Sequence, residues 1–285
     1  MIELTAVTKR FGPPWRAQAA IDGLSLTIPG PGIHCLLGRN GAGKTTLLKL
    51  IAGNLPATDG QVRVDGRAVT GSRVPTNVGF VEPYARLYNM RTGQMIAAAA
   101  RVQDGFDPGF AHVMADRFEL DPGKRYAELS FGMKTMLAGI LALAGGSSIV
   151  LMDEPMLGLD PIARARFNEL LLESFQDRPR TIVVSTHLID DIARVAQQLI
   201  LIDRGRLVVQ RSLDDIDERA YTLTGPAEQV TPLVAGLNVI ATRQAGATLA
   251  ADVYDDRIEP PAGVRIERLG LQDFFIDLVG GENHD

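Results

Sequence analysis

An α/β fold, with a parallel sheet covered by helices, is predicted by two features of this 285-residue sequence. Short apolar runs alternate with helical patterns over residues 149–202, which is typical of parallel strands joined by helices. A glycine-rich loop also joins an apolar strand at 33–37 to a helix at 45–52. The first 80 residues are rich in short strands bounded by turn residues, so we expect an antiparallel β subdomain at the N-terminal end.

Turn residues and periodicity predict the other elements of the main domain. Asp65-Gly66, between 61–64 and 67–69, has the composition of a tight hairpin turn. We expect further strands at 2–7, 24–28, 62–64, 149–152, 181–185 and 199–202. We expect helices at 161–175 and 188–196, and a mostly helical segment at 92–144 that is broken at 107–108 and 121–123.

The character of the chain changes after Gly205. Strand patterns occur at 220–223, 238–243, 248–253 and 264–267, and helical patterns at 226–235 and 271–279. Together they predict a small α+β appendage, and it carries no catalytic constellation. The predicted division is a main domain at 1–210, with a helical subdomain at about 84–147, and an accessory domain at 211–285.

The composition excludes several classes of protein. Hydrophobic residues make up 46% and charged residues 22%, so a large core is possible and wholesale disorder is excluded. The net charge of −5 is dispersed along the chain and predicts no nucleic-acid partner. The single cysteine, Cys35, rules out an internal disulfide and favours a reducing, cytosolic location.

No segment has the length and apolar character of a transmembrane helix, which needs about 20 mainly apolar residues. The best candidate, 136–152, is interrupted by two glycines and two serines. The first residues also lack the basic flank and apolar run of a signal peptide. Any role at a membrane is therefore expected to depend on a partner.

Gly38-Arg39-Asn40-Gly41-Ala42-Gly43-Lys44-Thr45 fits the phosphate-binding loop pattern. Glycines permit the backbone dihedrals and the close approach that let several N–H groups converge on phosphate oxygens. The helix that follows adds the positive end of its dipole. Lys44 is expected to reach the terminal phosphates and the Thr45 hydroxyl to bind Mg²⁺.

A second acidic motif completes the predicted nucleotide site. The apolar strand at 149–152 ends in Asp153-Glu154, and the alternation of a strand sends these two carboxylates in different directions. Asp153 is expected to hold Mg²⁺, directly or through water. Glu154 is expected to accept a proton from the attacking water. Two acids after a strand are more often a solvated loop, but their combination with the phosphate loop favours catalysis.

These motifs resemble those of the ATP-binding domains of ABC transporters, over roughly residues 2–210. The match comprises Walker A at 38–45, a signature-like segment at 129–133, Walker B at 149–154, a D-loop stretch at 154–161 and a switch histidine within 185–187. The resemblance implies a P-loop NTPase fold that binds ATP and Mg²⁺. It further implies that two such domains meet head to tail, as a homodimer or heterodimer, and enclose ATP between them.

The resemblance assigns roles to individual residues. Lys44, Glu154 and His187 would be catalytic, and Thr45, Asp153 and Glu82 would bind the metal. Residues of two kinds would contact ATP, some in the same chain and some across the dimer: Phe11, Gly38, Asn40, Gly41, Ala42, Gly43, Lys44, Thr45, Thr46, Ser130, Gly132 and Asp160. Phe11 would stack on adenine; the alternative for Phe11 is a core aromatic.

The sequence departs from the family pattern at three places. Phe131 and Met133 replace a glycine and a glutamine of the signature, although Ser130 and Gly132 are kept. The stretch 78–84 contains no glutamine where the family has one, and Glu82 is the candidate substitute. A carboxylate there still binds metal but adds negative charge beside the phosphates.

The expected partner is a separate transmembrane permease subunit, with this chain peripheral on the cytoplasmic face of the cell membrane. Segments 87–93 and 269–278 resemble bacterial exporter-type ATPases, which favours export. The alternative is a soluble ABC ATPase that serves no transporter. It is disfavoured because 46–128 has no heptad run and the chain has one Walker A motif. An unrelated phosphate-loop kinase or GTPase is disfavoured by Glu154 and the segment 129–133.

Overall fold

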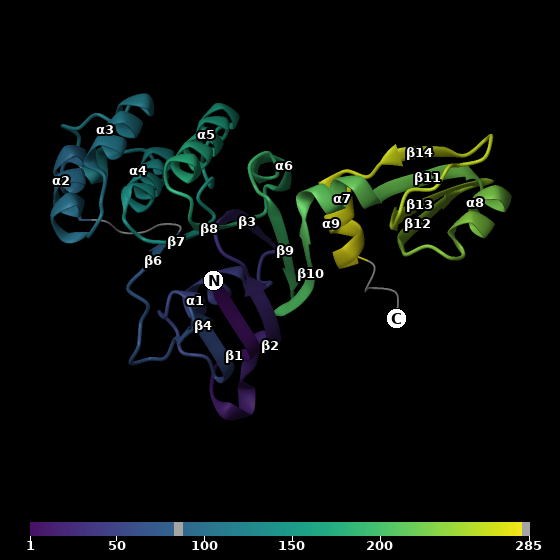
Figure 1. Ribbon diagram of the computed structural model, residues 1–285, viewed down its shortest axis with the longest axis horizontal. Helices are drawn as coiled ribbons and strands as arrows, with labels where there is room; N and C mark the ends of the chain where they lie inside the picture. The colour runs from purple at the N-terminus through teal and green to yellow at the C-terminus, as the bar shows by residue number, and fades with distance from the viewer. Residues whose placement is uncertain (83–87, 281–285) are drawn as a thin grey trace. The chain divides into compact units, whose positions relative to one another are not determined.

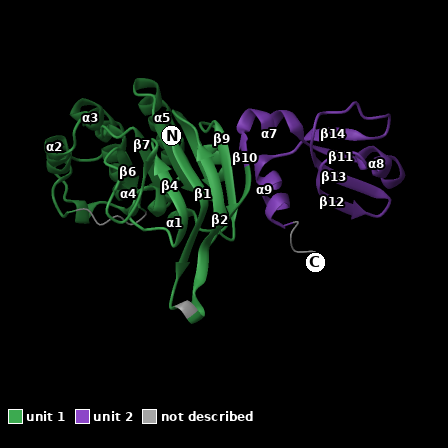
Figure 2. Cartoon of the chain, turned by 60° about the horizontal axis from the view of Figure 1, so that its bottom comes forward, with its two compact units in different colours: residues 1–209 green, residues 210–285 purple. Residues whose placement is uncertain are grey.

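The computed structural model describes residues 1–82 and 88–280, and it divides into two compact units, residues 1–209 and 210–285 (Figure 2). Each unit has its own apolar core. The first core lies around the N-terminal strands, the central sheet and the first helix, and the second lies around a separate sheet near the C-terminal end.

A six-stranded sheet forms the centre of the first unit. Its strands, in spatial order, are β10 (Arg206–Ser212), β9 (Gln198–Asp203), β3 (Gly32–Leu37), β8 (Thr181–Thr186), β7 (Ile149–Asp153) and β6 (Val78–Val81). From β9 to β6 every neighbouring pair is parallel. The strands β3, β7 and β8 are buried along their whole length. Their carboxyl ends therefore meet at one edge of the sheet, where ligands bind in folds of this kind.

The helices α1 (Lys44–Ile51), α5 (Pro161–Asp177) and α6 (Ile189–Ile192) lie between these strands in the chain (Figure 1). The helix predicted at 188–196 is observed only as α6, which has a single turn and is shorter than expected. The amide of Gln197 donates a hydrogen bond of 2.8 Å to the Ile33 carbonyl. This bond draws the chain back into the sheet before a longer helix forms.

A second, antiparallel sheet contains the N-terminal strands. Its order is β2 (Gln18–Ile28), β1 (Ile2–Phe11), β4 (Asp59–Val64) and β5 (Arg67–Ala68). Asp65 and Gly66 both have positive φ, 49° and 74°, as a type I′ turn requires, so the predicted hairpin is confirmed. The strands β1 and β2 are longer than predicted and form a hairpin of their own.

Three helices form a separate group beside the central sheet (Figure 1): α2 (Thr92–Val102), α3 (Pro108–Arg117) and α4 (Phe131–Ala144). The predicted break at 107–108 is the start of α3, where the Asp107 carboxylate accepts a hydrogen bond from the Phe110 amide. Residues 84–87, with which the predicted helical subdomain begins, lie outside the described residues. No helix in the described part of the chain is long and apolar enough to span a bilayer.

Over residues 210–280, the second unit is an antiparallel sheet with three helices. The strand order is β12 (Val239–Ala245), β13 (Thr248–Tyr254), β11 (Ala220–Pro226) and β14 (Arg265–Arg268). The helices are α7 (Leu213–Arg219), α8 (Ala227–Val234) and α9 (Leu271–Gly280). The predicted fold class, a parallel core sheet with an antiparallel β subdomain, a helical part and an α+β appendage, is confirmed. The sequence reasoning missed β6, β10 and α7.

Candidate functional site

The loop between β3 and α1 requires glycine at two positions. A Cβ on Gly38 would lie 2.5 Å from the Ile202 carbonyl oxygen, and one on Gly43 would lie 2.5 Å from the Ala20 carbonyl oxygen. Gly43 also has φ of +108°, a conformation that L side chains rarely adopt. These glycines let the loop turn sharply and place the start of α1 at the carboxyl edge of the sheet. Asn40 and Gly41 are exposed on the loop, Ala42 is buried below it, and Thr46 is half-buried on α1.

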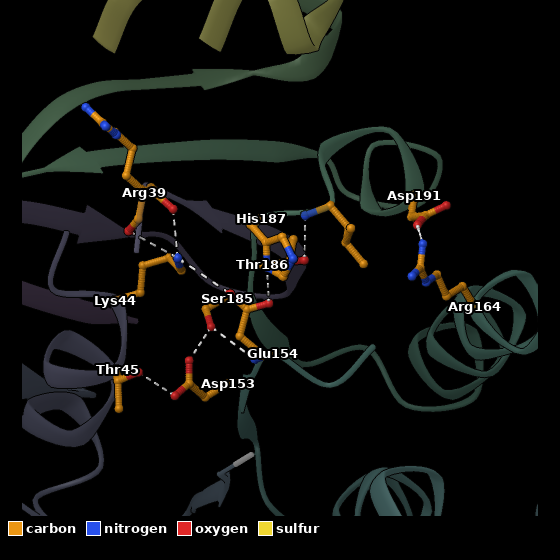
Figure 3. A network of polar contacts seen from close by, with 12 residues as sticks. Arg39, Lys44, Thr45, Asp153, Glu154, Arg164, Ser185, Thr186, His187 and Asp191 are labelled. Carbon is orange, nitrogen blue, oxygen red and sulfur yellow. Dashed lines mark hydrogen bonds and ion pairs between the residues drawn. The ribbon is translucent and has the colours of Figure 1, made fainter. Parts of the chain in front are cut away.

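Lys44 lies at the centre of a polar network at this edge (Figure 3). Its side chain is 7% exposed, and its ammonium donates a hydrogen bond of 2.7 Å to the Gly38 carbonyl. The same ammonium lies 3.5 Å from the Glu154 carboxylate oxygen Oε1. The other carboxylate oxygen, Oε2, lies 2.9 Å from His187 Nδ1. One carboxylate therefore joins a buried cation to a half-exposed imidazole.

The backbone of Glu154 explains how its side chain reaches both groups. Glu154 follows β7 and has φ of +48°, in the left-handed region. Its amide donates a hydrogen bond of 3.0 Å to the Ser185 carbonyl at the end of β8. Non-glycine residues in this conformation cost about 1–2 kcal/mol and persist where the surroundings hold them. The turn directs the Glu154 carboxylate away from that of Asp153.

Asp153 is 1% exposed, and two hydroxyl groups donate hydrogen bonds to its carboxylate. Thr45 donates at 2.6 Å to Oδ2, and Ser185 donates at 2.5 Å to Oδ1. Carboxylate and hydroxyl oxygens are the hard ligands that Mg²⁺ prefers, so this donor set fits the metal. Sequence reasoning gave Ser185 no role of its own. The parallel register, which pairs Asp153 with Ser185, is what brings them together.

Glu82 directly follows β6 and lies beside a different partner. Its Oε1 is 2.5 Å from the ammonium of Lys49 on α1, and the two side chains are 43% and 32% exposed. The remainder of the predicted motif, Pro83 and Tyr84, lies outside the described residues.

Ser130, Gly132 and Asp160 gather around a different pocket, of about 520 Å³, between the start of α4 and the loop before α5. Ser130 caps α4, with its hydroxyl accepting from the Met133 amide at 3.2 Å. Asp160 caps α5, with its carboxylate accepting from the Ala163 amide at 2.9 Å. The two caps are ordinary helix starts, and both face the same hollow.

Phe131 packs against the loop that contains Gly158. A Cβ on Gly158, where φ is +77°, would lie only 2.2 Å from the Phe131 Cδ1. The unusual aromatic at the signature position therefore fits against the D-loop only because residue 158 has no side chain. The Arg164 guanidinium holds the same loop through a hydrogen bond of 3.0 Å to the Leu159 carbonyl.

Phe11 is 45% exposed at the end of β1 and is not part of the core. The ammonium of Lys9 lies 5.3 Å from the centre of its ring. Lys9 is paired with Ile21, and the neighbouring residue Ala20 touches Gly43 in the phosphate loop. The hairpin that carries Phe11 is thus packed directly against that loop.

Residues 21–157 match the family described as ABC transporter. The chain is 31% identical over 220 residues to the ABC transporter ATP-binding protein YtrB of Bacillus subtilis, an alignment that covers 76% of this chain and 74% of that protein. The chain belongs to the ABC transporter family. The Nod factor export ATP-binding protein I of Paraburkholderia xenovorans is 29% identical, over 100% of this chain and 98% of that protein. The taurine import ATP-binding protein TauB of Burkholderia thailandensis is 33% identical, over 70% of this chain and 78% of that protein.

Solved structures of ABC proteins share the fold. A dimeric ATP-binding cassette in a post-hydrolysis state, bound to ADP and Pi, superposes with a TM-score of 0.66 at 21% identity, over 75% of this chain and 99% of that chain. The ABC family and its P-loop fold, both predicted from the motifs, are confirmed. The chain is an ATP-binding subunit of an ABC transporter.

Proposed function

We propose that this ABC subunit hydrolyses ATP with Mg²⁺, as one of two ATPase subunits that close on the nucleotide and drive a separate membrane-spanning partner. The observation that best supports this proposal is the network at the carboxyl edge of the sheet. There the Glu154 carboxylate lies 3.5 Å from the Lys44 ammonium and 2.9 Å from His187 Nδ1. A cation for phosphate, a carboxylate for water and an imidazole beside it are the groups that phosphoryl transfer to water requires.

The network suggests how the residues divide the work. The loop N–H groups and the Lys44 ammonium would bind the terminal phosphates, in competition with the Gly38 carbonyl and Glu154. The Glu154 carboxylate would accept the proton of the attacking water. His187, 2.9 Å from that carboxylate and 47% exposed, would hold the water or the γ-phosphate. Thr45 and Asp153 would hold Mg²⁺, which supplies charge neutralisation when bound. Glu82 is proposed as a third metal ligand.

The second pocket supports the proposal of two subunits. Ser130 and the backbone of Gly132 start α4, whose positive end faces outward beside Asp160. We assign this face to the nucleotide of the other subunit, and Phe11 to the adenine of its own subunit. The assignment of Phe11 to adenine is supported by the exposure of its side chain and by the contact of its hairpin with Gly43.

Paired substitutions test the ATPase assignment. Glu154→Gln should keep ATP binding while hydrolysis falls at least about 100-fold, because the base is lost and the shape is kept. Lys44→Ala should weaken ATP binding at least about tenfold. Glu173→Gln is a matched control, since Glu173 is a half-exposed acid that forms an ion pair with Arg117 at 2.6 Å away from the network. Near-normal turnover of Glu154→Gln would remove Glu154 as the base.

Export is the direction we propose. The Nod factor export protein aligns with the whole chain, residues 210–285 included, whereas the taurine import protein aligns with 70% of it.

We also propose that the chain sits on the cytoplasmic face of the membrane through its partner. Copurification of the tagged chain from native membranes in mild detergent tests this. A polytopic membrane protein in stoichiometric amount is expected; recovery of ribosomes, repair factors or nothing would favour an ABC ATPase that serves no transporter.

A further inference from the structure

Two side chains of α1 tie this helix to the edge of the central sheet. Thr45 donates its hydrogen bond of 2.6 Å to Asp153, and Lys49 lies 2.5 Å from Glu82. Thr45 and Lys49 are four residues apart, so they lie on the same face of α1, one turn from each other. The two links therefore run side by side from one helix to two neighbouring strands.

The strand register places the two acids level with each other. The strands β6 and β7 are parallel, and Val81 is paired with Met152. The residue after Val81 is Glu82, and the residue after Met152 is Asp153, so both are acids. Because parallel strands end at the same edge, these two acids occupy neighbouring backbone positions at the edge of the sheet where the phosphate site is proposed.

The distribution of charge shows what Lys49 adds. Asp153 accepts from two hydroxyl groups, and Glu154 lies beside Lys44. The charge of Glu82 is balanced by the Lys49 ammonium, which lies beside its carboxylate. A carboxylate without this partner would add one negative charge at the edge of a site that binds a polyanion, and like charges at such distances repel.

We propose that Lys49 is a positioning residue that holds the Glu82 carboxylate against α1 and cancels its charge until Mg²⁺ binds, so that an acid is tolerated beside the nucleotide phosphates. This inference rests on the proposed nucleotide site. It explains how the chain keeps a glutamate in this place, because the compensating cation is supplied by the phosphate-loop helix itself.

An ordinary surface ion pair has different consequences. Such a pair contributes about 0–1 kcal/mol to stability and nothing specific to ligand affinity. Lys49 also lies in the last turn of α1, where a cation favours the helix dipole. The ion-pair effect is lost when either partner is removed, and the dipole effect is lost when Lys49 is removed. Neither effect predicts that a second substitution, which removes the charge of Glu82, restores nucleotide binding to a variant without Lys49.

The test is a double-mutant cycle of Lys49→Met and Glu82→Gln, read as the affinity of the full chain for a fluorescent ATP analogue in EDTA. Lys49→Met should weaken binding about three- to tenfold at low salt, and less at high salt, because the unpaired carboxylate repels the triphosphate. Glu82→Gln alone should tighten binding. The double variant should return to within about twofold of the wild type, and Lys49→Arg should bind normally.

The matched control removes a similar ion pair elsewhere. Arg117→Met and Glu173→Gln break the contact of 2.6 Å between α3 and α5, whose side chains are 39% and 41% exposed, and should leave affinity unchanged. A double variant as weak as Lys49→Met, or a loss insensitive to salt, would overturn the role of Lys49. A wild-type chain that binds no nucleotide even when Mg²⁺ is supplied would instead refute the proposed function.

Discussion

Gly158→Ala is expected to lower the stability of the first unit through two contributions that can be measured separately. The first part is backbone strain, because Gly158 has φ of +77° and an alanine in the left-handed region costs about 1 kcal/mol more than glycine. The second part is displacement of the Phe131 ring, whose Cδ1 and Cε1 would lie 2.2 and 2.6 Å from the new Cβ. Real contacts of a Cβ are never this short, so the ring must move.

The size of the second part follows from the burial of Phe131. The residue is 36% exposed, so about two-thirds of the stabilisation from burying a phenylalanine, about 1.5–3 kcal/mol in full, is at stake. If half of that contact is lost, about 0.5–1 kcal/mol disappears, and the total for Gly158→Ala is about 1.5–2 kcal/mol. Gly23→Ala isolates the strain, since Gly23 has φ of +60° and no atom of the described residues lies within 4 Å of the added Cβ. This control should cost about 1 kcal/mol.

The thiol of Cys35 supplies the assay. Cys35 is the single cysteine, is 1% exposed in β3, and burial raises its pKa, so a thiol reagent reacts only after the first unit opens. Reaction across a urea series gives the free energy of opening for the wild type, Gly158→Ala, Phe131→Ala and the double variant. The cost of Gly158→Ala should fall to that of Gly23→Ala when Phe131 is alanine. Equal costs with and without the ring would refute the contact.

Three further predictions concern other parts of the chain. Burial and the neighbouring Asp252 raise the pKa of Asp277 to about 6, so the stability of the second unit should fall as pH rises from about 4 to above 6, by at most about 3 kcal/mol. Asp277→Asn should abolish this loss, measured as hydrogen exchange of α9 amides at pH 5 and pH 8. Arg180→Met should cost about 3 kcal/mol in the Cys35 assay, because the buried guanidinium donates to the Leu143 and Gly145 carbonyls at the end of α4; a cost below 1 kcal/mol would argue against this cap. Phe11→Ala should weaken ATP affinity about tenfold if the ring stacks on adenine, whereas unchanged affinity would assign Phe11 to the hairpin alone.

The fold was largely predictable because its signals are local. Glycines that precede a helix, an apolar strand that ends in two acids, and Asp65-Gly66 each specify a backbone conformation through their own chemistry. The strand β6 was missed because it has four residues, one of them a glycine, and too little pattern to recognise. The helix predicted at 188–196 was too long because Gln197 hydrogen-bonds to a strand distant in sequence.

The candidate site was predictable as a set of motifs but not as a set of contacts. Lys44, Asp153 and Glu154 follow from residue type and spacing. The partnership of Ser185 with Asp153 depends on which strands are neighbours, and that of Lys49 with Glu82 depends on how α1 lies over the sheet. Such pairings join residues more than 30 positions apart, and no local pattern records them.

The ion pair between Lys44 and Glu154 has a consequence for the timing of catalysis. The Lys44 ammonium lies 3.5 Å from one oxygen of the carboxylate that we propose as the base, and His187 lies 2.9 Å from the other oxygen. A phosphate group that binds the Lys44 ammonium would replace this ion pair and leave the Glu154 carboxylate in contact with His187 alone. On the proposed assignment, the lysine that binds the group to be cleaved is also the lysine that holds the base, so phosphate binding would release one end of the Glu154 carboxylate toward the attacking water.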